Sequence, residues 1–173
     1  MNKMARFGLL CMAVMGFISS PAIAQTSFCE TGLINNEEIN GDVIITGTEC
    51  YISESVIRGN ITVTDSPLFG MTFSAVYGRV EINNLTSEGD VIIKDTFVFD
   101  RSLVVDGAGE VWIFDSQVVG KPDTSNTAFR NITDEVQLIN NIFQGNLTCT
   151  EGIPFVLEER NFVGGKDTCA TGD

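Results

Sequence analysis

Ile39-Asn-Gly-Asp-Val-Ile-Ile45 and Ile57-Arg-Gly-Asn-Ile-Thr-Val63 are two copies of one pattern that recurs along the chain. Each copy has an apolar residue, a spacer, a glycine, a polar residue and then alternating apolar residues. Such alternation around a glycine is typical of a strand, a tight bend and a second strand, because glycine adopts positive φ without steric cost. Further copies follow: Val76-Tyr-Gly-Arg-Val-Glu-Ile82, Ser87-Glu-Gly-Asp-Val-Ile-Ile93, Gly107-Ala-Gly-Glu-Val-Trp-Ile113, Phe143-Gln-Gly-Asn-Leu-Thr-Cys149 and the degenerate Val163-Gly-Gly-Lys-Asp-Thr-Cys169.

The spacing of the copies predicts an all-β fold, a single-stranded parallel β-helix or β-solenoid. Many of the glycines recur at 18 to 20 residues, and helical patterning is nearly absent. We expect about six turns, stacked at the strand spacing of about 4.8 Å. The short gap between Gly78 and Gly89 predicts two bends in one turn, and the long gap between Gly109 and Gly145 predicts an extra turn with a looser bend near Gly120.

Two arguments on the handedness oppose each other. Parallel crossovers are right-handed in most proteins. Apolar residues also recur every six positions from Ile39 through Ile45, Tyr51 and Ile57 to Val63, which is typical of left-handed hexapeptide helices. The irregular lengths of the turns favour the right-handed form.

Polar residues between the copies are suited to the corners of the turns. Asp and Asn tolerate left-handed backbone and form local hydrogen bonds, as expected at Asn83-Asn84, Asp115-Ser116 and Asn140-Asn141. Asn side chains that stack in successive turns can also form amide ladders.

The first 24 residues are predicted to be a secretory signal peptide. Lys3 and Arg6 precede an apolar run over 7–18, and Ala22-Ile-Ala24 supplies the small residues that a signal peptidase needs. We expect cleavage before Gln25, which leaves 25–173 as a single domain without a membrane span in the periplasm or outside the cell. A run of 12 apolar residues is shorter than the roughly 20 that a membrane-spanning helix needs.

Four cysteines remain after that cleavage, and an even number in an exported chain predicts two disulfides. Four cysteines allow three pairings, of which the spacings of 21 and 20 residues favour Cys29–Cys50 and Cys149–Cys169. Cys149 and Cys169 each follow a repeat glycine by four residues. If both glycines occupy the same bend, the two cysteines stack one turn apart, in the position that Ile45, Val63, Ile82, Ile93 and Ile113 hold elsewhere. Strands about 4.8 Å apart fit the Cα separation of a disulfide. The two bridges would therefore crosslink neighbouring turns at the two ends of the solenoid.

The C-terminal stretch resembles the ending of many uncharacterised exported bacterial repeat proteins. Asn141-Ile-Phe-Gln-Gly-Asn-Leu-Thr-Cys149 is followed by a spacer with Pro154 and by Asn161-Phe-Val-Gly-Gly-Lys-Asp-Thr-Cys169. The close match covers about 30 residues, whereas the repeat pattern covers about 130. The resemblance implies a small parallel β-helix, broadly similar to the pectate-lyase superfamily scaffold, and it implies no catalytic residues.

Composition excludes several kinds of function. Lys and Arg number 10 against 23 Asp and Glu, and the net charge of −13 disfavours binding to nucleic acid. The chain has no histidine, which excludes a Ser-His-Asp triad and a His-ligated metal site. We therefore expect a non-enzymatic protein without a required cofactor.

Two groups of residues are candidate binding sites. Asp95, Asp100 and Asp106 flank an apolar strand region, where they would bind Ca²⁺ or simply form polar corners. Val91, Ile93, Phe97, Phe99, Leu103, Val105, Val111 and Ile113 share one parity, which predicts a common core face. Trp112 and Phe114 have the opposite parity, so they would face outward and contact a sugar ring or a partner.

The leading functional hypothesis is an exported β-helix protein of the cell envelope or extracellular space. Its acidic surface would serve binding or structural roles, with an envelope protein or a glycan as partner. The alternative is a glycan-binding or polysaccharide-degrading module, in which paired carboxylates would act on the glycan. A third possibility is self-association.

Overall fold

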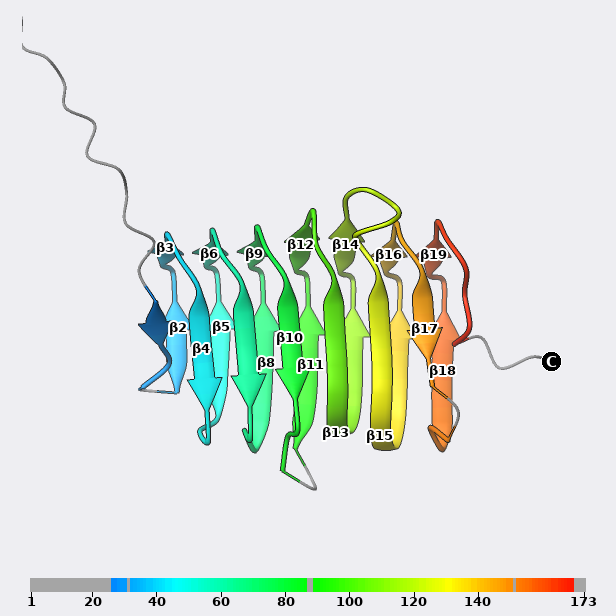
Figure 1. Ribbon diagram of the computed structural model, residues 1–173, viewed down its shortest axis with the longest axis horizontal. Coiled ribbons are helices and arrows are strands. Elements are labelled where there is room, and N and C mark those ends of the chain that lie inside the picture. The colour runs from blue at the N-terminus through cyan, green and yellow to red at the C-terminus, as the bar shows by residue number, and fades with distance from the viewer. Residues whose placement is uncertain (1–25, 31, 87–88, 151, 170–173) are drawn as a thin grey trace, which may run out of the picture.

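The computed structural model describes residues 26–30, 32–86, 89–150 and 152–169, and the predicted signal peptide lies outside these residues. The described residues contain 19 strands and no helix, and every strand pairing is parallel. The strands form a β-solenoid of about seven turns, shown side by side along the long axis in Figure 1. The predicted fold class is therefore confirmed. The solenoid has one turn more than expected, because the residues before Ile39 already form a complete turn.

Each turn contributes a strand to three faces. Face 1 consists of β1 (Ser27–Phe28), β4 (Val43–Thr46), β7 (Ile61–Thr64), β10 (Val80–Asn83), the first parts of β13 (Leu103–Phe114) and β15 (Thr127–Ile139), and β17 (Leu147–Cys149). Face 2 consists of β2 (Leu33–Asn35), β5 (Cys50–Ser53), β8 (Leu68–Thr72), β11 (Asp90–Lys94), the second parts of β13 and β15, and β18 (Phe155–Glu159). Face 3 consists of β3 (Glu38–Ile39), β6 (Val56–Ile57), β9 (Ala75–Val76), β12 (Phe97–Phe99), β14 (Gln117–Val119), β16 (Ile142–Phe143) and β19 (Phe162–Val163).

The core is a stack of apolar side chains inside the three faces. Alternate residues of most strands are buried, as strand geometry requires, and they lie directly above their equivalents in the next turn. On face 1, for example, Val43, Ile61, Val80 and Leu103 form one column. Because inward side chains fill the interior, ligand-binding groups have to lie on the outer surface.

The repeat glycines occupy two different corners. Gly41, Gly59 and Gly78 stack at the corner between face 3 and face 1, which we call the glycine corner. There a Cβ on Gly59 would lie 2.2 Å from the carbonyl oxygen of Gly41, so only glycine permits this close stacking. Gly89 and Gly109 pair at the corner between faces 1 and 2, where the Gly109 N–H donates to the Gly89 carbonyl at 2.8 Å. The prediction of two bends within one turn is thus confirmed.

The predicted looser bend near Gly120 is also present. β14 ends at Val119, and the chain crosses to β15 through a longer loop that begins at Gly120. Gly120 lies against the backbone of Asp100, its counterpart in the preceding turn. This loop is visible at the upper edge of the solenoid in Figure 1.

The corner between faces 2 and 3, which we call the polar corner, has the same backbone conformation in every turn. One residue per turn adopts a left-handed conformation with φ between 48° and 59°: Asn36, Glu54, Phe73, Asp95, Asp115, Asn140 and Arg160. The residue that follows it is buried and polar in five successive turns: Ser55, Ser74, Thr96, Ser116 and Asn141. Asn and Asp at four of the seven left-handed positions fit their known tolerance of this conformation.

The buried polar residues of this corner form a hydrogen-bonded ladder. A side-chain oxygen accepts the backbone N–H of the equivalent residue in the preceding turn, as in Ser55 N–H to Ser74 Oγ at 3.1 Å and Ser116 N–H to Asn141 Oδ1 at 2.9 Å. The Asn141 Nδ2 also donates to Asn161 Oδ1 at 3.1 Å, so the predicted amide ladder exists over two turns. The hydroxyl groups of Ser55, Ser74 and Ser116 accept the equivalent backbone N–H in earlier turns.

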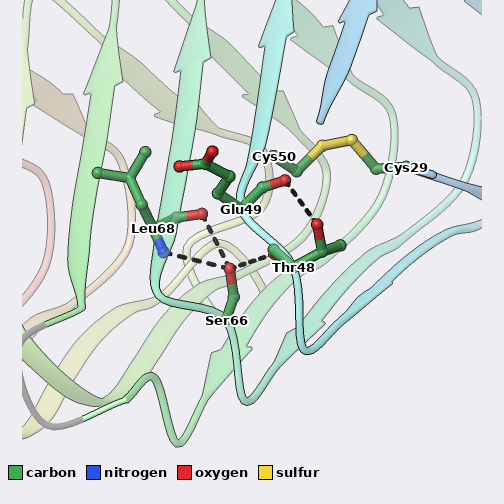
Figure 2. Close-up of a disulfide and its surroundings, with 6 residues drawn as sticks. All are labelled: Cys29, Thr48, Glu49, Cys50, Ser66 and Leu68. Carbon is green, nitrogen blue, oxygen red and sulfur yellow. Dashed lines mark hydrogen bonds between the residues drawn. A yellow bond between two sulfur atoms is a disulfide. The ribbon is translucent and has the colours of Figure 1, made fainter. Parts of the chain in front are cut away.

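Both predicted disulfides are present, one at each end. Cys29 and Cys50 have Cα atoms 6.1 Å apart, and those of Cys149 and Cys169 are 4.7 Å apart. Figure 2 shows the first bridge beside a corner at which Ser66 Oγ donates to the carbonyl of Thr48 at 2.6 Å and thereby connects two turns.

The register of the second bridge is confirmed in part. Cys149 continues the face 1 column of Ile45, Val63 and Ile82. The prediction that Ile93 and Ile113 belong to this column was wrong, because both lie on face 2. Their glycines, Gly89 and Gly109, bend the chain at a different corner.

Candidate functional site

Three aromatic side chains of turns 3 and 4 gather on the outer side of face 3. We call Tyr77, Phe97 and Phe99 the aromatic cluster; Tyr77 directly follows β9, and Phe97 and Phe99 belong to β12. The rings of Tyr77 and Phe99 are stacked with centroids 4.8 Å apart, and those of Phe97 and Phe99 are 5.8 Å apart. Tyr77 is 50% exposed and Phe97 is 39% exposed. The cluster is therefore an ordered apolar surface held by a rigid sheet.

This arrangement corrects the prediction that Phe97 and Phe99 face the core. Val98, between them, is buried instead, in register with Val76 and Val118. The alternation changes phase at Asp95 and Thr96, because the left-handed residue of the polar corner is followed by a buried polar one. The alternation of inward and outward residues in β11 therefore does not predict which residues of β12 face inward.

One end of the aromatic cluster is closed by an arginine. The Arg58 guanidinium lies 5.4 Å from the centroid of Tyr77, a cation–π geometry. Its Nε donates to Glu38 Oε1 at 2.7 Å. The hydrogen bond and the charge of Glu38 raise the pKa of Arg58 further above its already high value, so the cation is permanent.

Trp112 and Phe114 lie on the outer side of face 2, as the alternation predicts. Val111 and Ile113 are buried, and the two aromatic side chains are half-buried between neighbouring strands. The Trp112 indole N–H donates to Glu135 Oε1 at 3.0 Å, which fixes the orientation of the ring. Their binding role stays a prediction.

Beside Trp112 runs a column of carboxylates. The strand register stacks Asp90, Glu110 and Glu135 in consecutive turns of face 2. Partial desolvation raises the pKa of Glu110 above its ordinary value, and the negative charges of Asp90 and Glu135 raise it further. Sequence reasoning missed this column because its members come from three different strands with unequal spacing.

The three aspartates predicted as a calcium site are not brought together. Asp95 lies at the polar corner, Asp100 lies between faces 3 and 1, and Asp106 lies on face 1. Asp95 and Asp100 have positive φ, which fits the alternative role of corner residues, and Asp106 accepts a hydrogen bond from Asn131 Nδ2 at 2.6 Å. Within 26–30, 32–86, 89–150 and 152–169, no three His, Cys, Asp or Glu residues are arranged to hold a metal ion.

Comparison with known proteins gives no assignment, because no family model, no curated protein and no solved structure matches this chain. In the described part of the chain, no helix is long and apolar enough to cross a membrane. The parallel β-solenoid that the resemblance implies is present in the structure. Two disulfides fit an oxidising location such as the periplasm or the extracellular space.

Sequence reasoning missed the aromatic cluster, although a signal for it exists. Ala75-Val-Tyr77, Phe97-Val-Phe99 and Gln117-Val-Val119 share a central valine. The polar first residue of the third segment indicates that the flanking positions face solvent, and this would have placed the rings of the second segment outside.

Proposed function

We propose that this protein is an exported, non-enzymatic β-solenoid of the cell envelope or extracellular space whose outer surface binds another macromolecule. The observation that carries the proposal is the aromatic cluster, whose rings are exposed although the adjacent core is complete without them. Exposed aromatic groups on a rigid sheet are typical of recognition surfaces. The disulfides and the resemblance of the C-terminal stretch to exported bacterial repeat proteins support the location.

Site-specific photo-crosslinking in the producing cells tests the proposal. A photoreactive phenylalanine analogue replaces Tyr77, and in a control variant it replaces Phe155, which is equally exposed but lies on face 2 of the last turn. We expect a macromolecular adduct from position 77 and none from position 155. No adduct at position 77, or the same adducts at both positions, would overturn the proposal.

A second candidate function is glycan recognition on face 2, favoured by Trp112. Its indole N–H donates to Glu135, a member of the carboxylate column. The ring is suited to stacking on a sugar, and the carboxylates are suited to accepting hydrogen bonds from its hydroxyl groups. Binding to a panel of purified polysaccharides, measured for the wild-type protein and for Trp112→Ala, tests it. Tight binding of a polysaccharide by the wild type that is lost in Trp112→Ala supports this function. Equal binding by the two proteins, or no binding by either, contradicts it.

A further inference from the structure

A shallow notch of about 320 Å³ opens on the outer surface beside the aromatic cluster. Its apolar lining consists of Phe73, Phe97, Val56 and Ala75. The carboxylates of Glu54 and Asp95 also line it, and no Lys or Arg is among the described residues that line it. The notch thus combines two aromatic rings with two negative charges.

The notch exists because of a small residue in one outward column of face 3. Val56, Ala75 and Phe97 are equivalent positions in consecutive turns. In the adjacent column Tyr77 stacks on Phe99, whereas Ala75 leaves Phe97 without an aromatic neighbour in the turn before it. The side of the Phe97 ring toward Ala75 is therefore available to a ligand.

Phe73 is a second unusual feature of the notch. It has φ 48° at the left-handed position of the polar corner, where most other turns have Asn or Asp. A bulky side chain in this conformation is strained, and strain of this kind is retained mainly at functional sites. Because Phe73 is 61% exposed, burial does not compensate for the strain.

In the neighbouring column of face 3, a cation already stacks on an aromatic ring and pairs with a carboxylate. There the Arg58 guanidinium lies over the free side of Tyr77 and forms an ion pair with Glu38. The notch provides the same two partners, a free ring in Phe97 and carboxylates in Glu54 and Asp95, without a cation of its own. Guanidinium groups suit such sites because they stack on rings and bind carboxylates at once.

We propose that this notch binds an arginine side chain of a partner polypeptide. The guanidinium stacks on Phe97 against Phe73 and pairs with Glu54 or Asp95. The net charge of −13 complements a basic partner segment. This inference rests on the proposed function and adds to it the class and chemistry of the partner.

The test measures the affinity of the full protein for a labelled hexa-arginine peptide by fluorescence anisotropy at physiological ionic strength. Phe73→Asn removes one ring and supplies a residue that tolerates the left-handed conformation, so we expect the variant to fold. We expect about fivefold weaker binding, the range of a cation–π contact. An unchanged affinity for Phe73→Asn would overturn the inference.

A second pair of variants separates the notch from general attraction to an acidic surface. Asp95→Asn and Asp115→Asn remove one charge each at the same corner in adjacent turns, but only Asp95 lines the notch. We expect Asp95→Asn to weaken binding severalfold more than Asp115→Asn, and equal effects would contradict the inference. If the photo-crosslink at position 77 forms while the peptide does not bind, the inference is wrong and the proposed function stands.

Discussion

At the residue scale, a single missing Cβ decides how closely two turns approach at the glycine corner. A Cβ on Gly59 would lie 2.2 Å from the Gly41 carbonyl oxygen, so Gly59→Ala forces the two turns apart. We expect a loss of about 1–3 kcal/mol in the free energy of unfolding, the usual range for overpacking. Urea denaturation measures it.

Gly47→Asn is the matched control for this substitution. Gly47 has φ 67°, and nothing lies within 4 Å of a Cβ built on it. Because Asn tolerates this conformation, we expect little change in stability. An equal loss in both variants would show that close stacking at the glycine corner does not account for the effect, because glycine replacement by itself lowers the entropy of the unfolded chain and favours folding.

The buried ladder of the polar corner also depends on individual atoms. Asn141 accepts from the Ser116 N–H at 2.9 Å and donates to the Ile113 carbonyl at 2.8 Å. Asn141→Ala removes this donor from the Ile113 carbonyl and leaves the buried Ser116 N–H without its side-chain acceptor, so we expect a loss of about 1–3 kcal/mol. Asn141→Ser introduces the residue type found at the equivalent position Ser116, and its hydroxyl can still accept a hydrogen bond. The free energy of unfolding should therefore fall less than in Asn141→Ala, and thermal unfolding ranks the two variants.

At the element scale, β18 ends the solenoid with a charge in an inward position. Glu158 is paired in register with Leu138, a fully buried core residue of β15. An inward carboxylate on the last strand opposes pairing with another chain and thus limits end-to-end association. Burial raises the pKa of Glu158, and the charge of Asp167 raises it further.

This raised pKa sets the sign of a pH effect. A carboxyl whose folded pKa lies above its unfolded pKa destabilises the fold when it is ionised, so the penalty is present at neutral pH. It disappears as the pH falls through the folded pKa toward the ordinary value of 4.5. Glu158→Gln should therefore melt at a higher temperature than the wild type at pH 7, and this difference should shrink near pH 4. A difference that does not depend on pH would contradict this explanation.

The elements also show what the sequence predicts and what it does not. The repeated glycine unit predicts the strands of face 1 and the parallel stacking, because both depend on local alternation. The outward position of Phe97 and Phe99 depends on the left-handed residue Asp95, which changes the phase of the alternation. The aromatic cluster and the carboxylate column depend on which residues of unequal turns lie side by side, and local patterns do not determine that register.

At the scale of the whole molecule, the solenoid is a one-dimensional stack in which each turn contacts only its neighbours. The two disulfides lie at the two ends of the solenoid, where the terminal turn has only one neighbour and the outermost strands have unpaired edges. Each disulfide should therefore stabilise the turns at its own end of the solenoid more than the turns in the middle.

Hydrogen exchange of the backbone amides tests this local action. Replacing Cys149 and Cys169 with serine should accelerate exchange in β17, β18 and β19, with the effect fading toward β7 and β8. Replacing Cys29 and Cys50 should give the mirror image, so each double variant is the control for the other. Loops of about 20 residues predict a stabilisation of about 3 kcal/mol for each bridge in the chain-entropy model. A uniform acceleration along the whole chain would mean that the molecule unfolds as one cooperative unit, and the bridges would then stabilise the entire fold rather than its ends.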